Sequence, residues 1–193
     1  MEPLSFEDIV NIAEYEIERP SYRSRIIEYK KTRRIQLGEF ITLVFENRET
    51  IRFQIQEMMR AERIVLEERI KEEINIYNKL LPQSNSLSAT LLIEVTDQAK
   101  MREVLDSFIG IDQGCTTFLR IGNSLIEAEY EGGRSKENRI SAVHYIRFAL
   151  NDQQVHEFLS DYKKISFEID HKDYLAQSQI TKVIHNSLSH DLM

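Results

Sequence analysis

The segment from Thr50 to Leu81 constrains the fold of this chain more than any other. It contains no glycine and no proline, and its apolar residues recur at the three- and four-residue spacing of one helix face. These apolar positions are Ile51, Ile55, Met58, Val65, Ile70, Ile74, Tyr77 and Leu81. Pro82 and the polar stretch 83–86 end the pattern. We therefore expect one long central helix, which must bury its apolar face against another layer or a second copy of the chain.

Two shorter helices are expected before this segment. Ser5 and Asp8 have the spacing of a helix-capping pair, so the first helix begins there. Because the residue before a proline avoids helical geometry, Pro20 is expected to interrupt it. A second helix then covers residues 21–34, where apolar positions recur at helical spacing.

The pattern changes after Gly38 to short runs that favour strands. Several of these runs alternate apolar and polar residues, which is typical of half-buried strands. The expected strands are 40–45, 87–95, 116–121, 125–131, 141–150 and 165–169. Residues 174–188 are expected to form a C-terminal helix. The sequence thus predicts an α+β fold: a mostly antiparallel sheet of about six strands, with N-terminal helices, one long central helix and a C-terminal helix.

Size and composition favour a single domain over residues 1–193. The chain is 193 residues long and 41% hydrophobic, enough for one packed core. Within it we expect a helical layer over about 1–82 and a mixed sheet and helix part over about 87–193. No apolar run approaches the ~20 residues of a membrane span, and the first residues are acidic, unlike a signal peptide. We expect a soluble, cytoplasmic protein.

The net charge of −7 is unevenly distributed along the chain. Residues 1–18 hold six acids and no base, whereas residues 19–63 hold eleven bases and six acids. The rest of the chain is acidic. Such asymmetry can mark a surface that meets an anionic partner.

The first candidate binding surface lies on the helix expected after residue 50. Arg52, Gln56, Met59 and Arg63 fall on one stripe of that helix. Two guanidiniums and an amide in line could hold a carboxylate, a phosphate or a flat polar ligand. The alternative is a solvated charged face whose arginines pair with neighbouring acids.

A second candidate is an anion pocket between the long helix and the sheet. Arg52 and Glu57 could line it, together with Arg134 from the glycine-rich basic stretch 132–136. The alternative for that stretch is an ordinary loop between strands, because it lacks the spacing of known phosphate-binding loops.

The sequence predicts no metal site and no cofactor. All five histidines lie at or after His144, none with a metal-binding spacing, and Cys115 is the single cysteine. No catalytic residue can be assigned, and whether the protein is an enzyme stays open. Nucleic-acid binding is disfavoured because the pI is about 5.4 and no recognised motif is present, although 19–34 holds seven bases.

Several sequence motifs together resemble a bacterial family known only as a domain of unknown function. The most specific is the Glu-Asn-Arg…Gln-Glu-Met segment at 46–58; others are Lys-Lys-x-Arg-Arg at 30–34, Leu-Ser-Ala-Thr-Leu at 87–91 and Ile-Ser-Ala-Val at 140–143. The resemblance covers nearly the whole chain. It implies a gene neighbourhood with rubrerythrin and iron–sulfur oxidoreductases, and no catalytic residue, ligand or fold.

Two functional hypotheses follow. The first is an accessory protein that docks an acidic redox partner, with Arg52, Gln56 and Arg63 at the centre and Arg23, Lys30, Lys31 and Arg34 steering the encounter. The second is an enzyme or small-ligand-binding protein that uses the anion pocket. A homodimer formed through the long apolar helix is possible in either case.

Overall fold

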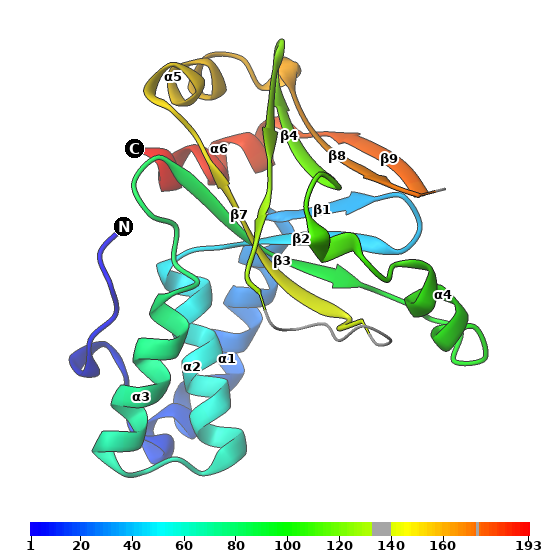
Figure 1. Ribbon diagram of the computed structural model, residues 1–193. Helices are drawn as coiled ribbons and strands as arrows, with labels where there is room; N and C mark the ends of the chain where they lie inside the picture. Colours follow the sequence, from blue (N-terminus) through cyan, green and yellow to red (C-terminus); the bar gives the residue numbers. More distant parts are fainter. Residues whose placement is uncertain (133–139, 173) are drawn as a thin grey trace.

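The computed structural model describes residues 1–132, 140–172 and 174–193. Three helices form a layer beside two antiparallel sheets (Figure 1). These helices are α1 (Ile12–Lys31), α2 (Arg48–Glu62) and α3 (Glu67–Asn78). The predicted α+β class with mostly antiparallel strand pairing is confirmed.

The described strands form one sheet of five strands and one of four. The first sheet has the order β1-β2-β3-β7-β6 and the second the order β5-β4-β8-β9. The first sheet contains β1 (Arg34–Leu37), β2 (Ile41–Glu46), β3 (Ser86–Ile93), β6 (Glu129–Tyr130) and β7 (Val143–Ala149). The second contains β4 (Thr117–Ile121), β5 (Ser124–Glu127), β8 (Ile165–His171) and β9 (Tyr174–Gln179). Shorter helices are α4 (Met101–Ser107), α5 (Asp152–Ser160) and α6 (Lys182–Leu192).

The main core lies between the two sheets. Strand β2 contributes Ile41, Leu43 and Phe45 to it, and Phe45 contacts Phe167 of β8 with ring centroids 5.0 Å apart. Successive side chains of a strand point to opposite faces, so the alternate residues of β2 face away from this core. They too are buried, which means that the helical layer covers the other face of the first sheet.

The two sheets are joined at both sides. On one side β5 leads through Ala128 directly into β6, so the chain passes from the second sheet to the first. On the other side the Tyr174 hydroxyl of β9 donates a hydrogen bond to the carbonyl of Leu37 and accepts one from the Phe40 amide. Gly38 makes this approach possible: its φ is +69°, and a Cβ there would lie 2.4 Å from the Tyr174 oxygen.

The expected single long helix is wrong: the structure divides it into α2 and α3. Helix α2 ends at Glu62, and the residue that caps it, Arg63, has the left-handed angles φ 53° and ψ 43°. The chain then turns back before Glu67. The two helices pack against each other through a shared apolar cluster of Ile51, Ile55, Met59, Ile70 and Ile74. Because the chain folds back, each helix buries the apolar stripe of the other. Periodicity along the sequence does not show this gain in buried apolar surface.

The expected interruption at Pro20 is also wrong, because α1 continues through it. The proline is exposed, whereas Tyr15 and Tyr22 on either side of it are buried. A proline within a helix costs about 3 kcal/mol through its lost hydrogen bond and a steric clash. Packing of these flanking side chains in the helical layer offsets that cost.

The described strands exceed the six expected, and the C-terminal helix begins later than expected. Residues 34–37, which follow the helix expected over 21–34 and were not expected to form a strand, form β1. Residues 174–179, expected in the last helix, form β9. Both are edge strands with alternating burial, and such short patterns are also compatible with a helix. The single-domain assignment over 1–193 stays a prediction. None of the described helices is both long and apolar enough to cross a membrane.

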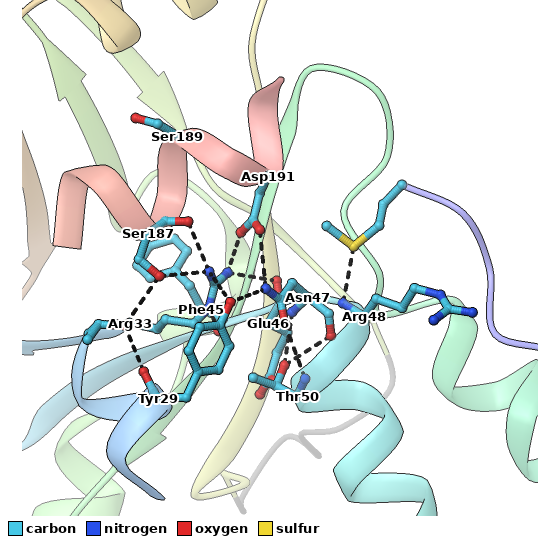
Figure 2. A network of polar contacts seen from close by, with 12 residues as sticks. Tyr29, Arg33, Phe45, Glu46, Asn47, Arg48, Thr50, Ser187, Ser189 and Asp191 are labelled. Atoms are coloured by element: carbon cyan, nitrogen blue, oxygen red, sulfur yellow. Dashed lines mark hydrogen bonds and ion pairs between the residues drawn. The ribbon is translucent and has the colours of Figure 1, made fainter. Parts of the chain in front are cut away.

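A buried ion pair fixes α6 to the start of the first sheet (Figure 2). Arg33 is fully buried and pairs with Asp191 of α6. Its other guanidinium hydrogens are donated to the carbonyls of Phe45 (2.9 Å), Glu46 (3.3 Å) and Ser187 (3.2 Å). Burial raises the pKa of the Asp191 carboxyl, and the adjacent Arg33 guanidinium opposes that rise.

Asp191→Ala is expected to lower the free energy of unfolding by about 3–5 kcal/mol, because it leaves the Arg33 charge buried without its partner. Urea denaturation followed by circular dichroism measures this change. The matched control is Lys71→Ala, which removes an exposed pair with Glu67 and should leave the midpoint unchanged. If Asp191→Ala lowered the free energy of unfolding no more than the control does, the ion pair of Arg33 and Asp191 would not be what fixes α6 to the first sheet.

Candidate functional site

The face of the first sheet turned away from the main core carries aligned polar side chains. We call it the outer face. Strand register places Val44, Thr90 and Tyr145 side by side in one row of β2, β3 and β7. The next row consists of Glu46, Ser88 and Arg147. Polar groups are thus concentrated on a surface that the helices cover in part.

Glu46 is the most unusual residue of the outer face. It is 2% exposed, although a carboxylate is rarely buried without an ionic partner. Its Oε1 accepts hydrogen bonds from the Thr90 hydroxyl (2.7 Å) and the Gln54 amide (2.9 Å). Its Oε2 is buried and has no hydrogen-bond partner among the described residues. Two hydrogen bonds therefore hold Oε1 in place, whereas Oε2 can still accept a hydrogen bond from another group.

A cavity of about 590 Å³ lies between the outer face and the helices α1 and α2. We call it the basic cavity. Its apolar lining includes Val44, Leu92 and Val143 of the sheet, and Glu46, Thr90 and Gln54 add polar groups. Its bases are Lys30, Lys31 and Arg34. The cavity therefore joins an apolar floor to a group of positive charges.

The bases of this cavity differ in how far they are already paired. Lys31 pairs with Glu28 at 2.7 Å and Arg34 with Glu94 at 2.5 Å, both exposed. Lys30 makes no ion pair within the part of the chain that the structure describes. Exposed pairs are weak, so an anionic ligand could compete for all three bases.

A second cavity, of about 250 Å³, lies further along the outer face. We call it the polar cavity. It is lined by the row of Glu46, Ser88 and Arg147, and by Glu129, Tyr130 and Lys79 among others. Glu46 and Tyr145 line both cavities, so the two are neighbours on one surface.

Comparison with known proteins identifies the family. The sequence profile of the family described as "Protein of unknown function (DUF3501)" matches residues 3–192. The chain belongs to the DUF3501 family. It is also similar to the crystal structure of a protein of unknown function from Burkholderia pseudomallei K96243, with 30% identity, a TM-score of 0.91 and full coverage of both chains. No curated protein matches it significantly.

The stripe predicted on α2 is used mainly for internal contacts in this DUF3501 chain. Gln56 is 1% exposed; its side-chain carbonyl accepts a hydrogen bond from the Val10 amide (2.8 Å) and its amide donates one to the Val10 carbonyl (3.1 Å). Met59 is buried in the helical core. Arg52 donates to the Asp8 carbonyl (2.8 Å). These residues hold the N-terminal segment on α2.

Of the remaining predicted residues, Lys30, Lys31 and Arg34 line the basic cavity. Glu57 accepts two hydrogen bonds from Arg19 (2.7 and 2.9 Å) and one from the Tyr15 hydroxyl (2.6 Å). These partners hold the pKa of the Glu57 carboxyl below its usual range. Arg63 is an exposed helix cap, and Arg134 lies outside the described residues. The structure does not bring this predicted set together.

Sequence reasoning missed Glu46, Ser88 and Arg147 as site residues. A signal was present, because Ser88 and Thr90 alternate with Leu87, Ala89 and Leu91 in β3. Such alternation normally indicates a strand with one solvated face. Here that face is buried as well, and only strand pairing shows that its polar residues align with Glu46.

Among the described residues, the single cysteine and the potential metal ligands offer no alternative candidate site. Glu127 lies 3.5 Å from the exposed Cys115 thiol and raises its pKa, which disfavours a reactive thiolate. Within 1–132, 140–172 and 174–193, no three His, Cys, Asp or Glu residues come together as possible metal ligands. The cavities of the outer face are therefore the strongest candidate site.

The side chain of His171, at the end of β8, is 6% exposed and stacks on Phe108 with ring centroids 6.2 Å apart. Burial, followed by the nearby Lys172 charge, lowers the pKa of its imidazole below the usual 6.5. The unfolded chain therefore binds a proton at a pH where the folded protein does not. Stability from this residue is complete above about pH 6.5 and falls as the pH drops toward the folded-state pKa.

The His171→Phe variant is expected to lose that part of the pH dependence. As the pH falls below about 6.5, the free energy of unfolding of the unsubstituted protein should decrease more steeply than that of the variant, by up to about 1.4 kcal/mol per pH unit. Urea titrations at a series of pH values measure both slopes. Parallel slopes would show that His171 does not titrate as its burial requires.

Proposed function

We propose that the protein binds a small amphipathic anion in the basic cavity. The observation that carries this proposal is the combination of an apolar floor with three bases in one cavity of about 590 Å³. Pockets for small molecules commonly measure about 300–1,000 Å³, with mostly apolar walls and a few polar groups that orient the ligand. The proposal develops the anion pocket expected between helix and sheet.

The charges around the cavity set the orientation of such a ligand. Lys30, Lys31 and Arg34 lie at the end of α1 and the start of β1, so an anionic group would be held there. The apolar part of the ligand would then lie along Val44, Leu92 and Val143. The proposal is one of binding, and it assigns no catalytic residue.

A fluorescent amphipathic anion, 8-anilinonaphthalene-1-sulfonate, tests the basic cavity directly. It should bind with saturable, one-to-one fluorescence enhancement. Replacing Lys30→Gln and Arg34→Gln together should weaken its affinity about 10-fold or more, because two charge-assisted contacts to the sulfonate are lost.

The control is Arg102→Gln, which removes an exposed base from α4, far along the chain from the cavity. Its affinity for the probe should equal that of the unsubstituted protein. Binding in the basic cavity would be contradicted if Arg102→Gln lowered the affinity for the probe as much as the double variant does. It would also be contradicted if the double variant bound the probe as tightly as the unsubstituted protein.

A second candidate function is docking of an acidic protein on α1. Arg23 and Arg25 are exposed on this helix and form no ion pair among the described residues. Surface charges of this kind increase the rate of encounter with a partner of opposite charge. An acidic redox protein of the rubrerythrin type is the partner that the family resemblance suggests.

For this candidate, Arg23→Glu combined with Arg25→Glu should abolish retention of the protein on an immobilised acidic rubrerythrin at low salt. Reversing two charges replaces attraction by repulsion. The fold is retained, because both side chains are exposed and the cation–π contact of Arg25 with the Tyr22 ring (5.5 Å) contributes only about 0.5–1 kcal/mol at such a site. Surface plasmon resonance gives the association rate. An unchanged rate in the variant, or no retention of the unsubstituted protein, would refute docking on α1.

A further inference from the structure

We infer that the polar cavity is a separate binding subsite for a single-ring compound that carries an amide-type group. An amide-type group presents an N–H donor and a carbonyl acceptor side by side. The inference rests on the row of Glu46, Ser88 and Arg147, and it needs no ligand in the basic cavity.

Three buried polar atoms of this row lack hydrogen-bond partners among the described residues. They are Oε2 of Glu46, Oγ of Ser88 and Nε of Arg147. Register pairs Glu46 with Ser88 across β2 and β3, and Ser88 with Arg147 across β3 and β7. Buried polar groups in folded proteins are nearly always satisfied, so three in one row of one cavity indicate a site for a polar ligand.

The positions of these groups are fixed by neighbouring contacts. Glu46 is held through its other oxygen by Thr90 and Gln54. Arg147 donates from its Nη2 to the Lys79 carbonyl at 3.0 Å, close to the end of α3. Ser88 is 5% exposed in the middle of the sheet. The cavity therefore presents preorganised groups, which lowers the cost of binding.

The three atoms together specify the chemistry of the ligand. The Glu46 oxygen accepts, the Arg147 nitrogen donates, and the Ser88 hydroxyl can do either. A simple amine would satisfy Glu46 but not Arg147, and a carboxylate would meet the buried Glu46 charge and also Glu129. An amide-type group satisfies both ends of the row without adding a charge.

The size and walls of the cavity fit one ring. Its volume of about 250 Å³ accommodates a single six-membered ring with one substituent, and Leu80 and Tyr130 supply apolar surface beside the polar row. A longer ligand would extend past Tyr145 toward the basic cavity.

Four ring compounds of similar size test the inference: benzamide, N,N-dimethylbenzamide, benzoate and benzylamine. Saturation-transfer NMR detects binding of each compound, and NMR titrations of the isotope-labelled protein with each compound measure the affinities. Benzamide should bind at least about 10-fold more tightly than the other three. Benzoate lacks the N–H donor, benzylamine lacks the carbonyl acceptor, and N,N-dimethylbenzamide has methyl groups in place of its donors.

Two serine variants separate ligand binding from structural support. Ser88→Ala should weaken benzamide binding and leave the melting temperature unchanged or higher, because its hydroxyl has no partner to lose. Ser166→Ala is the control: this serine is equally buried in β8, with hydrogen bonds to Glu168 (3.2 Å) and Gln177 (3.0 Å). It should lower the melting temperature and leave benzamide binding unchanged.

Absence of saturable benzamide binding, or equal affinity for benzamide and benzoate, would show that the row of Glu46, Ser88 and Arg147 does not recognise an amide-type group. If benzamide binds but the sulfonate probe does not bind in the basic cavity, the proposed function is refuted and this subsite stands. If the probe binds but benzamide does not, the subsite alone is refuted.

Discussion

The burial of β2 on both faces is the constraint on which the rest of the structure depends. One face builds the core between the two sheets, with Phe45 against Phe167. The other lies under the helical layer and still carries Thr42 and Glu46. A buried carboxylate must be compensated by neighbouring groups. The helical layer covers this face without sealing it, and two cavities remain beside Glu46.

The contacts that hold the helical layer in place also explain why the charged N-terminal part is not one open binding surface. Gln56 and Arg52 bind the backbone of residues 8–10, and Glu57 joins Arg19 and Tyr15. Arg33 is committed to Asp191 and to carbonyl oxygens. These polar groups support the fold. The bases left for a ligand or a partner are at the edge of the basic cavity and on the exposed side of α1.

Sequence periodicity predicted the α+β class, the antiparallel pairing and the position of β2, because these depend on local patterns. It failed where tertiary contacts override local preference: at Arg63, which turns the chain without a glycine, and at Pro20, which packing retains inside α1. It also failed at the site. The row of Glu46, Ser88 and Arg147 comes from three strands distant in sequence, so only the register of the sheet aligns them.

Native mass spectrometry of the protein purified gently from the cells that naturally produce it tests the central claim most directly. The claim is that the outer face around Glu46 binds a small molecule. We predict a species heavier than the 22.8 kDa chain by one small organic molecule, and its loss in Glu46→Gln purified in the same way. Detection of only the bare chain in both proteins, or of the same bound molecule in both, would contradict the claim.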